Sequence, residues 1–171
     1  GLAVRAVLGD PGPGRPPHVD SIAIGVEGAK STVKIVELPA SAAKQIGDVL
    51  PFELEASLPF DLTEAVFDYR LVSTPKRSED DKKSTELNVL VAVAKTLDVS
   101  TRIDLVKGAL TMEPERIDVG AFPVANMLPF MPALAEGVVA VVDLGTISSD
   151  IVILAAGEAR FARTISLGTK G

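Results

Sequence analysis

The stretch VVDLGTISSDIVIL, residues 141–154, consists of two apolar runs joined by a glycine and small hydroxyl residues. Two such runs around a short turn predict a β-hairpin. In the plainer of two interpretations, Asp143 and Ser148 hold the turn through side-chain hydrogen bonds. In the second, the turn of this hairpin holds a phosphate group. On hairpin chemistry alone, the plainer interpretation is favoured.

Composition limits the functions that the chain can have. It has 171 residues, of which 47% are hydrophobic and only 4% aromatic, so a packed core must consist mostly of aliphatic side chains. A net charge of −6 argues against nucleic acid as a partner. The lack of cysteine excludes disulfides and thiolate metal sites, and the single histidine, His18, can form neither a metal site nor a catalytic triad by itself. We therefore predict no catalytic residue and no metal site in this chain.

We expect neither a membrane span nor a signal peptide in this sequence. No apolar run approaches the roughly 18 residues that span a bilayer, and the start lacks the cationic and apolar regions of a signal peptide. Because the chain begins at Gly1 and ends in GTKG, we expect it to be a fragment of a longer protein that is exposed to the cytosol.

Upstream of the hairpin, the hydrophobic periods predict a second unit. A strand is expected at 19–26, a solvated loop at 74–85 and a short helix at 121–130. The order strand, helix, strand, strand, helix, strand is expected for 31–38, 39–58, 63–72, 86–96, 98–110 and 115–120. This β-α-β-β-α-β order is that of a ferredoxin-like α+β unit. Three antiparallel strands of a second sheet are expected at 136–145, 148–157 and 158–167.

Several blocks, in their order along the chain, resemble one protein family. They are LPASAAKQIGDVLPFELEASLPFDLTEAVFDYRLV (38–72), LNVLVAVAK (87–95), ERIDVGAFPVANML (115–128) and the segment from residue 141 to the end. Together they resemble the PilM/GspL group, which are actin-like proteins of the inner-membrane platforms of type IV pili and type II secretion. The repeated LPFE and LPFD resemble the secretion L component more closely than the pilus protein.

The resemblance implies an α/β, actin-like fold with a ferredoxin-like insertion. Residues 1–30 are then a remnant of the first actin-like subdomain with a Pro/Gly linker. Residues 31–119 are the inserted 1C-type subdomain, and residues 120–171 begin the second actin-like subdomain.

For the hairpin, the resemblance implies the D-x-G-x-x-T-x-D phosphate motif of actin-like ATPases. The cofactor-binding residues that it implies are Asp143, Gly145, Thr146, Ser148, Ser149 and Asp150. The chain departs from the chaperone-type pattern at Thr146 and Ile147, which replace glycines and hinder the approach of the backbone to phosphate. We predict no cofactor in this fragment, with ATP and Mg²⁺ as the alternative for the full-length protein.

The function implied is that of an adaptor at the cytoplasmic face of the bacterial inner membrane. It docks the assembly ATPase of type II secretion and links it to platform proteins of the membrane. The alternative is a PilM-type ATP-binding protein that binds a cytoplasmic peptide of an inner-membrane partner. An unpaired sheet edge also predicts a homodimer.

A few further side chains allow more than one interpretation. Glu53, Glu55 and Asp61 form either a solvated helix face or a partner-binding edge. Phe52 and Phe60 are either core anchors or interface hot spots, and the core role is favoured because aromatic residues are scarce and the core needs volume. A group of three apolar residues is expected to pack the subdomains together, with an exposed apolar groove as the alternative: Met127, Phe130 and Met131.

Overall fold

The computed structural model describes residues 18–72, 86–120, 122–132 and 137–170, together with residues 7, 8 and 12. The loop predicted at 74–85 lies outside these residues, as does most of the Pro/Gly segment at 9–17. In chain order the helices and strands are β1 (Ala23–Val26), β2 (Ser31–Pro39), α2 (Ile46–Glu55), β3 (Ala65–Val72), β4 (Glu86–Lys95), α3 (Thr96–Leu110), β5 (Arg116–Val119), α4 (Phe122–Ala125), β6 (Val138–Leu144), β7 (Ser149–Ala155) and β8 (Glu158–Ile165). Short 3-10 helices are η1 (Gly28–Lys30), η2 (Ala40–Lys44), η3 (Leu62–Glu64) and η4 (Leu128–Phe130).

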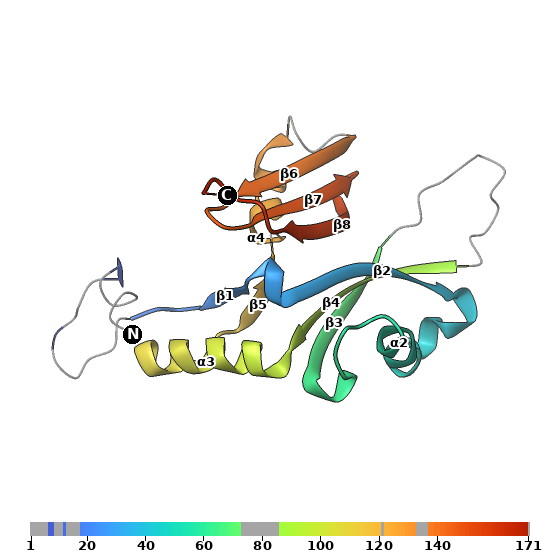
Figure 1. The fold of residues 1–171 in the computed structure, drawn as a ribbon, viewed down its shortest axis with the longest axis horizontal. Coiled ribbons are helices and arrows are strands. Elements are labelled where there is room, and N and C mark those ends of the chain that lie inside the picture. Colours follow the sequence, from blue (N-terminus) through green and yellow to red (C-terminus); the bar gives the residue numbers. More distant parts are fainter. Residues whose placement is uncertain are drawn as a thin grey trace.

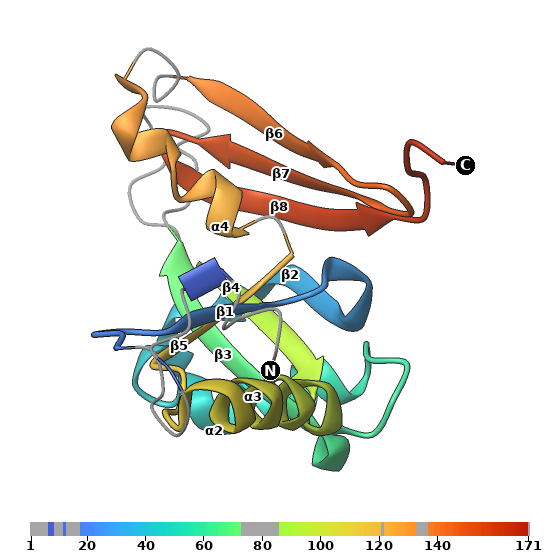
Figure 2. The same cartoon turned by 90° about the vertical axis from the view of Figure 1, so that its left-hand side faces the viewer.

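The strands form three sheets. Two are antiparallel, with the orders β2-β4-β3 and β6-β7-β8, and the third is the parallel pair β1-β5. Figures 1 and 2 show the β6–β8 sheet stacked over the β2–β4–β3 sheet, with α2 and α3 on the side away from β6–β8. The mixed α/β architecture and the three consecutive C-terminal strands are confirmed.

Strand β4 lies at the centre of its sheet and is covered on both faces. Val89, Val91 and Val93 pack under α2, whereas Leu90 packs toward the β6–β8 layer. Because β4 is buried on both faces, its sequence is a nearly continuous apolar run. The cluster that contains Leu90 also contains Val152 of β7, so the two antiparallel sheets share one core.

Helix α2 is continuous through Pro51, although a proline inside a helix favours a kink or a break. The break lies earlier, at Gln45, between η2 and α2. Proline removes one backbone hydrogen bond inside a helix, and the buried side chains at four-residue spacing hold the helix against the sheet despite that loss. These anchors are Ile46, Leu50 and Leu54.

The expected order of the ferredoxin-like unit is found, but its fourth strand has a different partner. In the described residues β5 pairs in parallel with β1, from Ala23↔Arg116 to Val26↔Val119, and the sheet formed by β2, β4 and β3 has three strands. The end of α3 explains this pairing, because buried Ala109 and Leu110 cluster with Ile22, next to β1. The chain leaving α3 therefore runs alongside β1. The boundaries at 30/31 and 119/120 stay predictions.

Candidate docking cleft and the β6–β7 hairpin

The β-hairpin predicted from residues 141–154 is present as β6 and β7. Asp143 lies directly opposite Asp150, and Leu144 lies opposite Ser149, with the turn at 145–148. Asp143 is exposed and Asp150 is half-buried. A Cβ on Gly145 would lie 2.5 Å from the Ser148 carbonyl oxygen, so the closed turn requires glycine there.

The turn of the hairpin is covered by the end of the described chain. The buried Ser149 hydroxyl donates a hydrogen bond to the Leu167 carbonyl at 2.6 Å. The amides of Thr169 and Lys170 donate to the carbonyls of Gly145 and Thr146 at 3.0 and 3.1 Å. The Ser149 proton that a phosphate would accept already has an acceptor in the protein.

The carboxylate of Asp150 also has a partner. It accepts a hydrogen bond from the Thr164 hydroxyl of β8, and it lies against the bare backbone of Gly28 in η1. A Cβ on Gly28 would overlap both side chains. The cavity at this junction measures about 20 Å³, which is room for roughly one water and not for a phosphate group.

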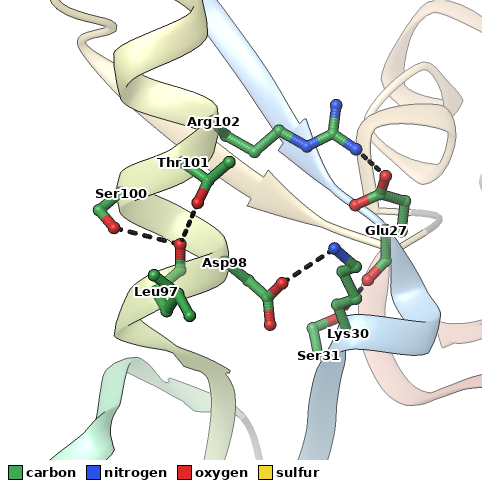
Figure 3. Close-up of polar contacts among 8 residues, drawn as sticks. All are labelled: Glu27, Lys30, Ser31, Leu97, Asp98, Ser100, Thr101 and Arg102. Carbon is green, nitrogen blue, oxygen red and sulfur yellow. Dashed lines mark hydrogen bonds and ion pairs between the residues drawn. The ribbon is translucent and has the colours of Figure 1, made fainter.

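The turn that contains Gly28 is held from its other side by helix α3. Glu27 forms an ion pair with Arg102, and Lys30 forms one with Asp98 at 2.9 Å (Figure 3). The 27–30 turn therefore joins α3 to the strand that carries Asp150. Sequence reasoning missed this role, although the short GVEGAK turn between two apolar runs was a visible signal.

The six predicted cofactor residues thus have different surroundings. The fold brings Asp143 and Asp150 together, leaves Thr146 exposed and half-buries Ser148. Ser149 is turned into the β6–β8 unit. Gly28 and Thr164, which the sequence did not single out, complete the surroundings of Asp150.

A larger cleft opens on the face of the β2–β4–β3 sheet opposite α2. It measures about 220 Å³. Its floor comes from Leu90 and Ala92 of β4, and its walls come from the edge strand β3 and from β5 and α4. The other residues that line it are Asp68, Tyr69, Arg70, Ile117, Asp118, Val119, Phe122 and Asn126.

Strand β3 gives this cleft a polar, hydrogen-bonding rim. Within the described residues β3 pairs only with β4, so its outer backbone groups have no strand partner. The side chains of Asp68 and Arg70 are exposed along the same stretch. Such an edge can pair with an added extended peptide.

The three predicted partner-binding carboxylates lie on two elements, and their role in partner binding stays a prediction. Glu53 and Glu55 are exposed on the last turn of α2. Asp61 instead caps η3, accepting hydrogen bonds from the amide and hydroxyl of Thr63 at 2.8 and 2.7 Å. These bonds, the hydroxyl bond first, hold the pKa of Asp61 below its ordinary value.

This cap can be tested by titration. Because the folded pKa of Asp61 is depressed, its stabilising contribution is present above the unfolded value and is lost as pH falls through the folded value. Replacing Thr63 with alanine should raise the Asp61 pKa toward its ordinary value, because the hydroxyl donor is lost. NMR titration of the carboxyl carbon measures this. An unchanged Asp61 pKa would contradict the assigned cap.

Two expectations about aromatic and sulfur-containing side chains need correction. Phe60 is half-buried against the core under α2, as expected, but Phe52 is 74% exposed. Phe52 lies on the face of α2 opposite Leu50 and Leu54, so the scarcity of aromatics does not bury it. Met127, Phe130 and Met131 are also exposed, whereas the neighbouring Leu128 is buried. The packing role expected for those three is wrong.

Strand β6 forms an outer edge of its sheet in the described part of the chain. Its side chains Val138, Val142 and Leu144 are exposed. The homodimer expected from an unpaired edge stays a prediction, which light scattering at high protein concentration can check. None of the described helices is long and apolar enough to cross a membrane.

The family model for the type IV pilus assembly protein PilM matches residues 14–171. The chain belongs to the PilM family. No curated protein matches it. The predicted PilM/GspL resemblance is thereby confirmed.

Solved structures related to this PilM-family chain share its fold. The PilM-PilN type IV pilus biogenesis complex matches with a TM-score of 0.69 and 21% identity, over 90% of this chain and 45% of that chain. The cytoplasmic domain of EpsL, an inner membrane component of the type II secretion system of Vibrio cholerae, matches with a TM-score of 0.52 and 16% identity, over 86% and 52%. A Bacteroides thetaiotaomicron protein described as having an actin-like ATPase fold matches with a TM-score of 0.47 and 10% identity, over 90% and 50%.

At these identities the likeness shows the fold alone: the predicted α/β class is confirmed, and the chain shares the fold of the PilM-PilN and EpsL structures. The PilM-family chain spans about half the length of the solved structures that it matches.

Proposed function

We propose that this part of the protein is an adaptor of a pilus-type platform, and that the cleft beside β3 holds an extended cytoplasmic segment of an inner-membrane partner. The observation that carries the proposal is the position of the cleft beside β3, which is an edge strand of its sheet in the described part of the chain, with Asp68 and Arg70 on the rim. The edge supplies main-chain hydrogen bonds, and the apolar floor accepts a side chain of the bound segment.

The size of the cleft favours a peptide over a small molecule. Its volume of about 220 Å³ is below the roughly 300–1,000 Å³ of pockets that enclose drug-sized ligands. An extended peptide needs only a shallow groove, because most of it lies along the strand.

The pilus branch of the family is favoured over the secretion branch that the LPFE and LPFD segments suggested. The matching family model is that of the pilus protein, and the TM-score is 0.69 for PilM-PilN against 0.52 for the EpsL domain. PilM is bound to PilN in that complex. A PilN-like membrane protein is therefore the partner that we assign to the cleft.

The adaptor is non-catalytic in this proposal, and the motor activity belongs to a separate assembly ATPase. The engagement of the Ser149 hydroxyl by Leu167 and of the Asp150 carboxylate by Thr164 supports this role. Calorimetry with Mg-ATP tests it, since micromolar binding that is lost on Asp143→Ala would favour the nucleotide-binding alternative.

Reversing the charge on the cleft rim should weaken partner binding. With a synthetic peptide that covers the cytoplasmic segment of the PilN-like protein, Arg70→Glu should raise Kd about tenfold, because a rim charge next to the bound backbone changes sign. Fluorescence anisotropy measures Kd. Proline at alternate peptide positions should also weaken binding, because it removes main-chain donors.

The matched control is Lys44→Glu, the same charge reversal at an exposed residue of η2, outside the residues that line the cleft. It should leave Kd within about twofold, as expected for a distant exposed charge in salt. Equal effects of the two variants, or no effect of Arg70→Glu, would contradict the assignment of the cleft.

A further inference from the structure

The outer face of α2 exposes a large aromatic side chain. Phe52 is 74% exposed, while Leu50 and Leu54 on the opposite face are fully buried. Leaving a phenylalanine in water forfeits the stabilisation that its burial supplies. In this aromatic-poor chain, whose aromatic content is 4%, Phe52 is not needed by the core that α2 covers.

Carboxylates surround Phe52 on the same face. Asp48 precedes it by four residues and Glu55 follows it by three, so both lie beside it on the helix surface. Glu53 is adjacent in sequence. All three are exposed, and among the described residues none of them forms an ion pair.

The positions of two of these carboxylates are unfavourable for the helix itself. Glu53 and Glu55 occupy the last turn of α2, which contains no basic residue. Negative charge at a helix C-terminus opposes the helix dipole. Charges that oppose a helix dipole, with no ion pair among the described residues to compensate for them, are typical of a functional surface.

We infer that the outer face of α2 is a docking surface for a basic amphipathic segment of another protein. Phe52 enters an aliphatic socket on that segment, and lysine or arginine side chains around the socket pair with Asp48, Glu53 and Glu55. An aromatic anchor surrounded by polar groups is the usual centre of a protein interface, and the charge of the rim selects a basic partner.

The same charges argue against a lipid surface. An interfacial helix that inserts a phenylalanine into an anionic membrane carries lysine and arginine on its polar face. The carboxylates of α2 would be repelled by acidic headgroups.

This surface is independent of the proposed peptide cleft. Helix α2 covers the face of the sheet that carries Val89, Val91 and Val93, whereas the cleft opens on the face that carries Leu90 and Ala92. A single chain can therefore hold two different partners at once, which is what an adaptor requires.

The test uses the whole 171-residue chain and a synthetic helical peptide of about 15 residues with leucine on one face and lysine on the other. The peptide should bind, and its counterpart with glutamate in place of lysine should not. Phe52→Ala should weaken binding at least about tenfold, and Glu55→Lys should weaken it about fivefold or more and reduce its salt dependence.

Two controls separate docking from folding. Glu37→Lys makes the same charge reversal at an exposed position of β2, outside α2, and should leave binding unchanged. Arg70→Glu in the cleft should also leave it unchanged, which distinguishes this proposal from the one for the cleft. Glu55→Lys should keep or raise Tm, because it improves the match with the helix dipole.

Three results would overturn the inference. The first is the absence of peptide binding, and the second is binding that Phe52→Ala leaves intact or that Glu37→Lys weakens as much as Glu55→Lys. The third is cosedimentation of the chain with phosphatidylglycerol vesicles that depends on Phe52, which would assign this face to a membrane.

Discussion

Replacing Leu54 with alanine is expected to lower the free energy of unfolding by about 2–5 kcal/mol. Leu54 is fully buried and belongs to the cluster that joins α2 to β2 and β4. The substitution removes apolar contacts and leaves a cavity between the helix and the sheet. Because stabilities of whole domains are only about 5–15 kcal/mol, this single change threatens the attachment of α2.

Urea denaturation followed by circular dichroism measures this effect, with the slope m unchanged if only stability has changed. The control is Leu97→Ala on α3, where the side chain is 75% exposed and the expected change is within about 0.5 kcal/mol. A loss below about 1 kcal/mol for Leu54→Ala would mean that α2 is not anchored as described. Binding tests on Phe52 would then lose their structural basis.

Replacing Gly28 with alanine is expected to destabilise the protein by about 1–3 kcal/mol. The added Cβ would overlap the Thr164 hydroxyl and the Asp150 carboxylate. Movement of the 27–30 turn away from the added Cβ would disturb its ion pairs to Arg102 and Asp98 of α3. The strain should appear as faster hydrogen exchange in β7 and β8, where the contact between the layers is loosened.

The matched control is Gly108→Ala, in which the new Cβ meets open space on α3. It should stabilise the protein by about 0.5–1 kcal/mol, because alanine is the better helix former. The double variant Gly28→Ala/Thr164→Ala should recover part of the loss, because one overlapping atom is gone. Equal effects of the two glycine substitutions would contradict the close packing at Gly28.

The periodicity of the sequence located most helices and strands, because the spacing of apolar residues in an element involves only positions close together in the chain. The nearly continuous apolar run of β4 is typical of a strand that is buried on both faces, and β4 is buried in this way at the centre of its sheet. Ile46, Leu50 and Leu54 lie on one face of α2, and the helical period places Phe52 on the opposite face. Its assignment to the core was wrong because it relied on composition instead of phase.

Local sequence patterns do not predict which strands pair when those strands are far apart in the chain. The sequence order β-α-β-β-α-β is compatible with a four-stranded sheet, yet β5 lies beside β1. That choice depends on Ala109 and Leu110 packing against Ile22, far earlier in the chain. A contact between residues so far apart produces no periodic pattern of apolar residues in the sequence.

In the β6–β7 hairpin, too, some features follow from the local sequence and others only from tertiary contacts. The sequence by itself determined the two strands and the turn between them, because apolar runs and turn residues act over a few positions. Only the tertiary structure decided that Ser149 bonds to Leu167 and that Asp150 lies between Thr164 and Gly28. Whether a hydroxyl or a carboxylate is free depends on neighbours brought close by folding, and these neighbours come from segments that no local motif connects.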